Sequence, residues 1–103
     1  MDLDNKVSLV TGAGQGIGEG IAKNLASKGS KVIVVDLNKQ SSENVAEAIN
    51  AKFPNTAFSF QADLTKLDEI ESMLEFGVLK FNKIDCICNN AASSKGIGPV
   101  ENY

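Results

Sequence analysis

A glycine-rich segment near the start of the chain constrains the fold most strongly. Residues 11 to 18 are Thr-Gly-Ala-Gly-Gln-Gly-Ile-Gly, and they follow an apolar run, Val7–Thr11, that predicts a strand. Ile17, Ile21 and Leu25 then recur at the spacing of one helix face. Glycines allow a tight turn and a close approach of the backbone, and a helix start presents unpaired N–H groups to an anion. This order of elements therefore predicts a phosphate site and a bound nucleotide.

Apolar strands and amphipathic helices alternate along the whole chain. Strands are predicted over Val7–Thr11, Lys31–Asp36, Thr56–Ala62 and Ile84–Asn89. Helices are predicted over Gly16–Lys28, Lys39–Phe53 and Lys66–Phe81, and Ala92–Tyr103 is predicted to be a loop. This alternation predicts one α/β domain over residues 1–103, a Rossmann-like, doubly wound parallel sheet. We expect a shortened version of that sheet, with about four strands in the order 3-2-1-4.

Finer patterns predict how these elements begin, end and pack. Gly29 is expected to cap the first helix, and Asn82 to follow the third helix in a left-handed conformation. Phe58 and Phe60 share one face of their strand, which suggests a position near a sheet edge. The third helix is expected to bury one apolar stripe, made of Leu67, Ile70, Leu74, Val78 and Phe81.

Asp36 ends the second predicted strand, 18 residues after Gly18. An acidic residue about 20 residues beyond such a glycine loop binds the adenosine ribose in dinucleotide-binding folds. Its carboxylate would accept hydrogen bonds from the ribose hydroxyls and would repel a 2′-phosphate, which favours NAD over NADP. The chain contains no arginine, and Lys39 is the only cation near Asp36 in the sequence. The alternative is an ordinary strand-ending aspartate in a turn.

Composition narrows the possible partners. The net charge of −3 argues against a nucleic-acid partner, and no apolar run approaches the roughly 20 residues that span a bilayer. The acidic start, Met1 to Asp4, does not resemble a secretory signal, so we expect a cytoplasmic protein without a membrane partner. Cys86 and Cys88 are expected to be small core residues in a reducing compartment. The chain contains no histidine, and no metal site is expected.

Four elements of the chain resemble the short-chain dehydrogenases/reductases. Residues 11–18 match the Thr-Gly-x-x-x-Gly-x-Gly cofactor signature of that family, and Lys83-Ile84-Asp85 is also typical of it. Asp63-Leu64 is similar to the Asp-Val/Leu element beside the adenine, although Asp63 could instead cap the third helix. Asn89-Asn90-Ala91-Ala92 resembles the family's Asn-Asn-Ala-Gly, with a methyl group added at Ala92. The likeness extends from Lys6 to about Tyr103.

The resemblance implies a dinucleotide site, with NAD preferred over NADP. In the family, Asn89 is thought mainly to tie neighbouring loops together, while Asn90 and Ala91 line the ribose. The implied cofactor-binding residues are Gly12, Gly14, Gln15, Gly16, Ile17, Gly18, Asp36, Leu37, Asp63, Leu64, Asn90, Ala91 and Ala92. The expected activity is that of an NAD(P)-dependent oxidoreductase acting on an alcohol or carbonyl substrate, of which this chain would be the N-terminal, cofactor-binding portion.

The catalytic residues of that family have no counterpart in this chain. They are a serine, a Tyr-x-x-x-Lys pair and a further asparagine, whereas Tyr103 is the only tyrosine here and is the final residue. Ser93 and Ser94 occur too early to match the catalytic serine. We therefore expect no catalytic residue and no activity in the chain alone, and self-association is possible. A non-catalytic module that binds NAD or adenosine nucleotides is the alternative, and an interaction domain without a ligand is a weaker one.

Overall fold

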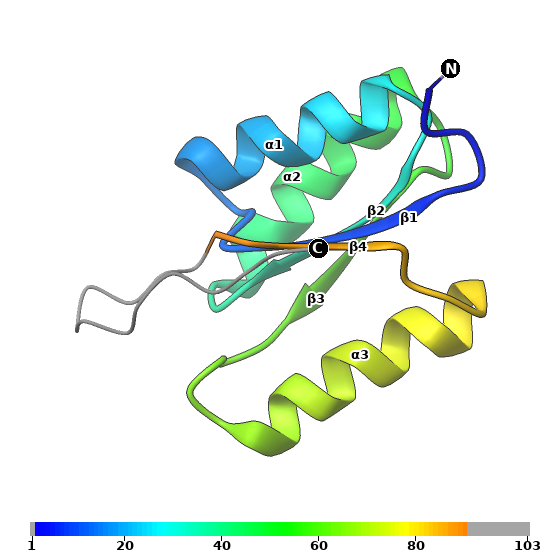
Figure 1. The fold of residues 1–103 in the computed structure, drawn as a ribbon. Coiled ribbons are helices and arrows are strands. Elements are labelled where there is room, and N and C mark those ends of the chain that lie inside the picture. The colour runs from blue at the N-terminus through cyan, green and yellow to red at the C-terminus, as the bar shows by residue number, and fades with distance from the viewer. Residues whose placement is uncertain (1, 91–103) are drawn as a thin grey trace.

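The computed structural model describes residues 2–90, which form a four-stranded parallel sheet covered by helices on both faces (Figure 1). The strands are β1 (Val7–Thr11), β2 (Lys31–Asp36), β3 (Ala57–Gln61) and β4 (Cys86–Asn89). Their order in the sheet is β3-β2-β1-β4, and all three neighbouring pairs are parallel. The predicted fold class and strand order are therefore confirmed.

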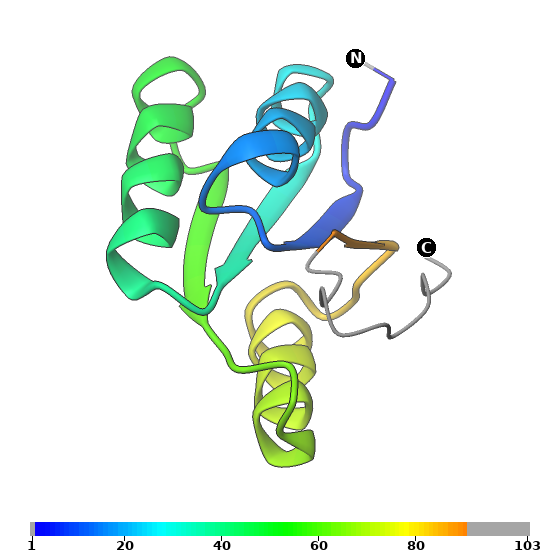
Figure 2. The same ribbon diagram turned by 90° about the vertical axis from the view of Figure 1, so that its left-hand side faces the viewer.

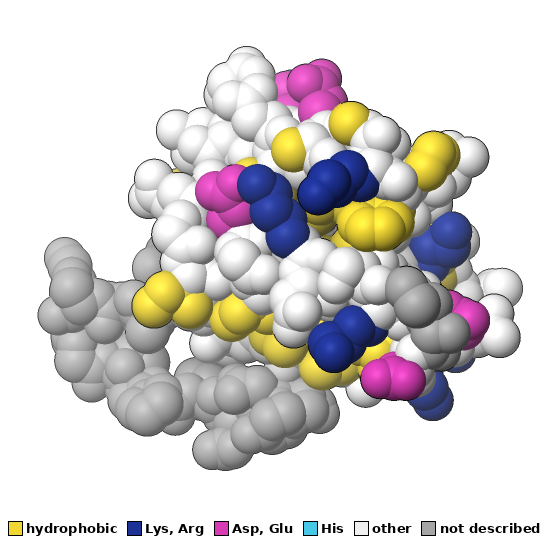
Figure 3. Space-filling view, turned by 90° about the horizontal axis from the view of Figure 1, so that it is seen from above, with side chains coloured by type: hydrophobic (Ala, Val, Ile, Leu, Met, Phe, Trp, Pro, Cys, Tyr) yellow, Lys and Arg dark blue, Asp and Glu magenta, His cyan; other side chains and the backbone are white. Residues whose placement is uncertain are grey.

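Three helices connect the strands. They are α1 (Gly16–Ser27), α2 (Lys39–Lys52) and α3 (Leu67–Phe81). Helices α1 and α2 cover one face of the sheet, and α3 lies alone on the other face among the described elements (Figures 1 and 2). Charged side chains of both signs are interspersed over the face that carries α1 and α2 (Figure 3). Within residues 2–90, no helix is both long and apolar enough to cross a membrane.

Two apolar cores lie on opposite sides of the sheet because successive residues of a strand point to opposite faces. Val10, Val32 and Val34 pack beneath α1 and α2, together with Ala22 and Ile49 from those helices. The second core packs against α3; its buried members are Val7, Leu9, Ile33, Val35, Ala62 and Met73. All of β1 and the four central residues of β2 are buried because helices cover both faces of the sheet.

Most element boundaries agree with the sequence prediction to within one residue, and β4 is the exception. This strand begins at Cys86 and not at Ile84. The Ile84 side chain packs with the core beneath α3, and the Asp85 backbone N–H bonds to the Val7 carbonyl at 2.8 Å. The Asp85 carboxylate also accepts from the Val7 N–H at 2.8 Å, so these residues form the turn that leads into the strand.

Helix termini follow the predicted capping residues. Asn82 adopts the left-handed conformation after α3, with φ of 70°. Gly29 also has a positive φ, of 104°, and its N–H bonds to the Ala26 carbonyl just after α1 ends. These residues stop their helices because the left-handed conformation turns the chain out of the helical path.

The predicted orientation of α3 is only partly correct. Leu67 is 70% exposed and Val78 is 48% exposed, although both belong to the predicted apolar stripe. The helix instead turns Met73 and Gly77 toward the sheet. A side chain at Gly77 would lie within 2.8 Å of the Ile33 Cδ1 and Ile84 Cδ1 atoms, so the absence of one lets the helix approach closely. The buried face is thus displaced around the helix from the stripe.

Strand β3 lies at one edge of the sheet, as the spacing of its phenylalanines predicts. Phe58 contacts Phe81 edge to face, with ring centroids 5.3 Å apart, and the Lys80 ammonium lies 4.5 Å from the Phe58 ring centroid. The Asn50 side chain accepts from the Ala57 N–H at 2.8 Å and donates to the Ala57 carbonyl at 2.9 Å. Asn50 therefore occupies hydrogen-bonding groups that an edge strand otherwise presents to other chains.

Candidate cofactor site

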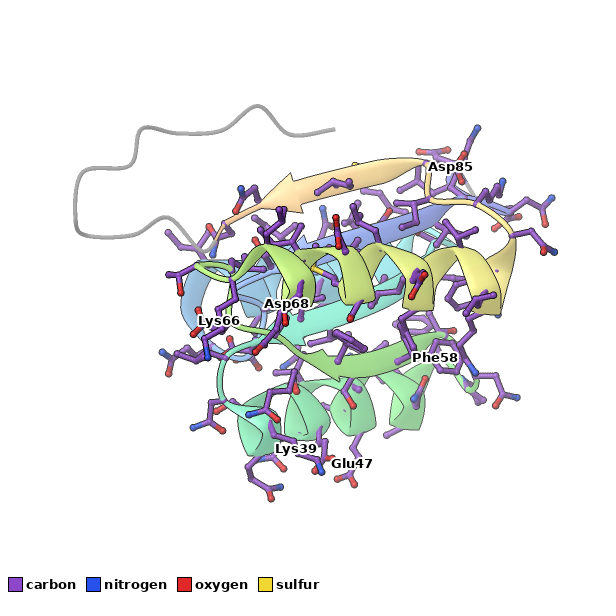
Figure 4. The ribbon with its side chains drawn as sticks, turned by 90° about the horizontal axis from the view of Figure 1, so that it is seen from below. Lys39, Glu47, Phe58, Lys66, Asp68 and Asp85 are labelled. Carbon is purple, nitrogen blue, oxygen red and sulfur yellow. The ribbon has the colours of Figure 1, made fainter. Side chains whose placement is uncertain are left out.

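The predicted binding residues of the described chain gather at the carboxyl end of the sheet. The glycine loop follows β1, Asp36 ends β2, Asp63 and Leu64 follow β3, and Asn90 follows β4. In Figure 4, Lys66 lies at this end near the start of α3, and Asp85 lies at the opposite end. The β1–β4 neighbourhood is also where the strand order reverses, the place at which open α/β sheets bind ligands. Ala91 and Ala92 lie outside the described residues.

The glycine loop is held tightly against the start of α1. A Cβ atom at Gly18 would lie only 2.0 Å from the Gly12 carbonyl oxygen and 2.8 Å from the Asn90 amide nitrogen. Only glycine fits this position without displacement of the loop. The helix cap, Gln15, makes no side-chain hydrogen bond to the first turn. Helix starts carry unsatisfied N–H groups and a partial positive charge, so this end of α1 can receive a phosphate oxygen.

The Asp36 carboxylate already has partners in the protein. One oxygen accepts from the Gly14 N–H at 2.8 Å, and the other accepts from the Asn38 N–H at 2.9 Å. A Cβ atom at Gly14 would lie 2.8 Å from the Asp36 Oδ2 atom, so glycine is needed for this contact. Sequence spacing predicted a ribose-binding role for Asp36, which stays a prediction, but did not predict that Asp36 anchors the glycine loop.

A small cavity opens between the ends of β1, β2 and β3. Its volume is about 200 Å³, and it contains five of the predicted residues, Gly12, Asp36, Leu37, Asp63 and Leu64. Three lining residues were not predicted, namely Val35, Ala62 and Thr65. Whole ligand pockets usually measure about 300–1,000 Å³, so this cavity suits one part of a dinucleotide. The alternation of side-chain directions along β2 could have indicated Val35, and the position of the turn after β3 could have indicated Ala62 and Thr65.

Asp63 organises the turn between β3 and α3 and does not cap the helix. Its Oδ1 atom accepts from the Thr65 hydroxyl at 2.6 Å and from the Thr65 N–H at 2.9 Å. The hydroxyl contact, followed by the backbone contact, lowers the pKa of the Asp63 carboxyl. The Asp63 N–H in turn donates to the Glu69 carboxylate at 2.7 Å. The cap position of α3 belongs to Lys66, which makes no side-chain capping bond, so the helix-cap alternative for Asp63 is wrong.

Thr11 connects the ends of β1 and β4. Its hydroxyl donates to the Asn89 side-chain oxygen at 2.9 Å and accepts from the Asn90 N–H at 2.9 Å. Asn89 thus links two strand ends, and the backbone of Asn90 is held beside the glycine loop. The sequence prediction did not include Thr11 among the site residues, although it is a polar residue ending an apolar strand.

Two apolar side chains next to the site are exposed to solvent. Ile17 in the first turn of α1 is 75% exposed, and Leu37 after β2 is 65% exposed. The chain therefore keeps apolar surface beside a polar loop, as sites for amphipathic ligands do. Within residues 2–90, no group of three or more potential metal ligands is present. The arrangement offers anion-binding N–H groups, a carboxylate and an apolar cavity, which are the means to bind a nucleotide.

The chain is similar in sequence to curated dehydrogenases and reductases. The chain is 36% identical over 97 residues to the 7alpha-hydroxysteroid dehydrogenase of Escherichia coli K12, and the match covers 94% of this chain and 36% of that protein. It is 40% identical over 96 residues to the hydroxynaphthalene reductase arp2 of Aspergillus fumigatus, covering 92% of this chain and 35% of that protein. The chain therefore spans about a third of the length of these curated relatives.

Solved structures of a dehydrogenase and a reductase also superimpose on this chain. A hydroxysteroid dehydrogenase from Escherichia coli superimposes with a TM-score of 0.83 at 35% identity, over 88% of this chain and 38% of that one. A 3-ketoacyl-(acyl-carrier-protein) reductase from Brucella melitensis, solved in complex with NADH, gives a TM-score of 0.75 at 41% identity, over 81% of this chain and 32% of that one. The short chain dehydrogenase family matches residues 6–103. This chain therefore belongs to the short-chain dehydrogenase/reductase family of oxidoreductases.

Proposed function

We propose that this chain is the cofactor-binding portion of an NAD(P)-dependent oxidoreductase that acts on an alcohol or a carbonyl compound. Asp36 carries the proposal, because its carboxylate lines the cavity and also bonds to the Gly14 N–H. A ribose bound here would meet a carboxylate that accepts from hydroxyls. The phosphates would meet the open start of α1, and the adenine would occupy the cavity beside Leu37 and Leu64.

We further propose that the chain prefers NAD to NADP. The extra phosphate of NADP is attached to the ribose hydroxyl that Asp36 would bind, so two negative charges would meet there. Two like unit charges 4 Å apart repel each other by about 1 kcal/mol in bulk water and by about 4 kcal/mol near a protein surface. This repulsion should lower the affinity for NADP by about fivefold or more. The chain contains no arginine that could offset this repulsion.

The chain alone is proposed to bind the cofactor without oxidising or reducing a substrate. Tyrosine general acids need a neighbouring cation to bring their pKa near the working pH. Residues 1–103 contain a single tyrosine, Tyr103, and no Tyr-x-x-x-Lys pair. A stand-alone nucleotide-binding module would share this inactivity, so binding experiments on the chain test the site and not the reaction.

Calorimetry with NAD, NADP and AMP tests the proposed site. We expect AMP to bind within about threefold of NAD and NADP to bind at least about fivefold more weakly. Asp36→Asn removes the charge but keeps an oxygen that can accept from the Gly14 N–H, so it should abolish the discrimination against NADP. Glu47→Gln on the exposed side of α2 makes the same change in net charge away from the cavity and serves as the control.

Two results would contradict the proposal. Undiminished discrimination in the Asp36→Asn variant would show that another group selects the cofactor. A much higher affinity for NAD than for AMP would show that the nicotinamide half also binds to this chain.

A further inference from the structure

The turn that leads into α3 engages almost every polar group of Asp63. The Asp63 N–H donates to the Glu69 carboxylate at 2.7 Å, and the Asp63 carbonyl accepts from the Lys66 N–H at 3.0 Å. The Oδ1 atom accepts from both the hydroxyl and the N–H of Thr65. Within residues 2–90 the Oδ2 atom has no hydrogen-bond partner, although Asp63 lines the cavity at the carboxyl end of the sheet. Oδ2 is therefore the atom that remains for a ligand in this cavity.

Glu69 makes its contact outside its own helix. It is the third residue of α3, where a glutamate commonly bonds back to the N–H of the cap residue. The cap residue here is Lys66, whose N–H bonds to the Asp63 carbonyl instead. The partly buried Glu69 reaches the N–H of Asp63, six residues earlier in the chain. Glu69 is not among the residues that line the cavity, so it can act on a ligand there only through Asp63.

The cavity combines apolar walls with a hydrogen-bond acceptor at Asp63. Its apolar lining residues are Val35, Leu37, Ala62 and Leu64, which can enclose a flat ring. An ionised carboxylate only accepts hydrogen bonds. A purine with an exocyclic amino group could donate to the Oδ2 atom. A purine with a carbonyl oxygen in the same place would bring a second acceptor to the carboxylate, and the two oxygens would repel each other.

We propose that Glu69 is a positioning residue, which holds Asp63 so that the cavity selects an amino-purine such as adenine over an oxo-purine such as hypoxanthine. The inference rests on the proposed function, because it assumes that the base of the cofactor enters this cavity. Glu69 fixes the backbone of Asp63, Thr65 fixes one carboxylate oxygen, and the other oxygen receives the amino group. Without the Glu69 contact the turn can move, so the selection is lost although Asp63 is still present.

Calorimetry with AMP and inosine monophosphate (IMP) measures this selection, because IMP carries a carbonyl oxygen where AMP carries the amino group. We expect the native chain to bind AMP about tenfold more tightly than IMP, since a hydrogen bond to a charged group is lost with IMP. Asp63→Asn keeps an oxygen for Thr65 and puts an N–H donor in place of Oδ2. This variant should therefore prefer IMP.

Variants of Glu69 test its positioning role. Glu69→Ala should reduce the preference for AMP to below about threefold, whereas Glu69→Gln keeps an oxygen that can accept from the Asp63 N–H and should retain the preference. Glu69→Asp, which is one methylene shorter, tests the same contact with a smaller change and should also reduce the preference. Glu71→Ala on the exposed side of α3 is the control and should retain the preference. The proposed discrimination between NAD and NADP by Asp36 should be unchanged in all four variants.

The possible outcomes separate this inference from the proposed function. Equal affinities of the native chain for AMP and IMP would overturn the inference alone, and so would a Glu69→Asp or folded Glu69→Ala variant with an undiminished preference. A merely structural role of Glu69 would weaken both nucleotides equally and leave their ratio unchanged. Absence of AMP binding to the native chain would overturn the inference together with the proposed function.

Discussion

Replacement of Gly18 by alanine tests the geometry of the glycine loop most directly. The added Cβ atom would lie 2.0 Å from the Gly12 carbonyl oxygen, and ordinary contact begins at 3.4 Å. The loop must therefore retreat by about 1.4 Å, against a backbone carbonyl that cannot rotate away like a side chain. Overpacking of this kind costs about 1–3 kcal/mol or more. For a domain of this size that loss lowers the melting temperature by about 4–8 °C per kcal/mol.

Gly20→Ala in the same helix provides the matched control. A Cβ atom at Gly20 meets nothing within 4 Å, and the residue is exposed. Alanine is favoured over glycine inside a helix by about 1 kcal/mol, so this variant should be more stable than the native chain. Two identical substitutions, two residues apart, should thus change stability in opposite directions.

Urea denaturation followed by far-ultraviolet circular dichroism measures both variants. We expect the urea concentration at the unfolding midpoint to fall for Gly18→Ala and to rise for Gly20→Ala. The dependence of the unfolding free energy on urea concentration should be unchanged in both variants. A Gly18→Ala variant as stable as the native chain would refute the close contact between Gly18 and Gly12. The result does not depend on the proposed nucleotide binding, because no ligand is present in the assay.

Two further predictions concern the edges of the sheet. Asn50→Ala removes the side chain that bonds to the Ala57 N–H and carbonyl, and it should lower the free energy of unfolding in urea by about 1–2 kcal/mol. The control, Asn44→Ala on the exposed side of the same helix, should lower it by less than about 0.5 kcal/mol. Equal losses would contradict the role of Asn50. The hydrogen bond from the Val7 N–H lowers the pKa of the Asp85 carboxyl below its ordinary value of 3.8. The contact therefore stabilises the fold at pH values above 3.8, and this stabilisation is lost as the pH falls through the lowered pKa. Asp85→Asn should therefore be less stable at neutral pH, with the deficit shrinking in thermal melts at about pH 2; a deficit independent of pH would contradict this.

Much of the architecture could be predicted because it depends on local patterns. The β-branched run of β2 and the glycine loop after β1 specify a buried parallel strand and a strand-to-helix turn without knowledge of distant residues. Asn82 could be recognised as a helix stop for the same reason. The position of the cavity also follows from topology, since parallel strands bring Asp36 and Asp63 together at the carboxyl end of the sheet.

Features that depend on packing between distant elements could not be predicted. Helix α3 carries more apolar residues than one face can bury, so periodicity could not determine which of them face the sheet. That choice depends on Gly77, which lets the helix contact Ile33 and Ile84, and it leaves Leu67 and Val78 exposed. The start of β4 was misplaced for a similar reason, because Ile84 takes part in the same contact.

The two contacts of Asp36 are compatible with the proposed binding of a ribose by the same carboxylate. Its bond to the Gly14 N–H holds the glycine loop in place without a ligand. A ribose hydroxyl is both donor and acceptor, so it could donate to Asp36 while accepting from the Gly14 N–H. The loop would then keep a hydrogen-bonded link to β2 through the ligand. Asp36→Ala would remove both roles at once, whereas Asp36→Asn separates them, since it keeps an acceptor for the loop and loses only the charge that opposes a 2′-phosphate.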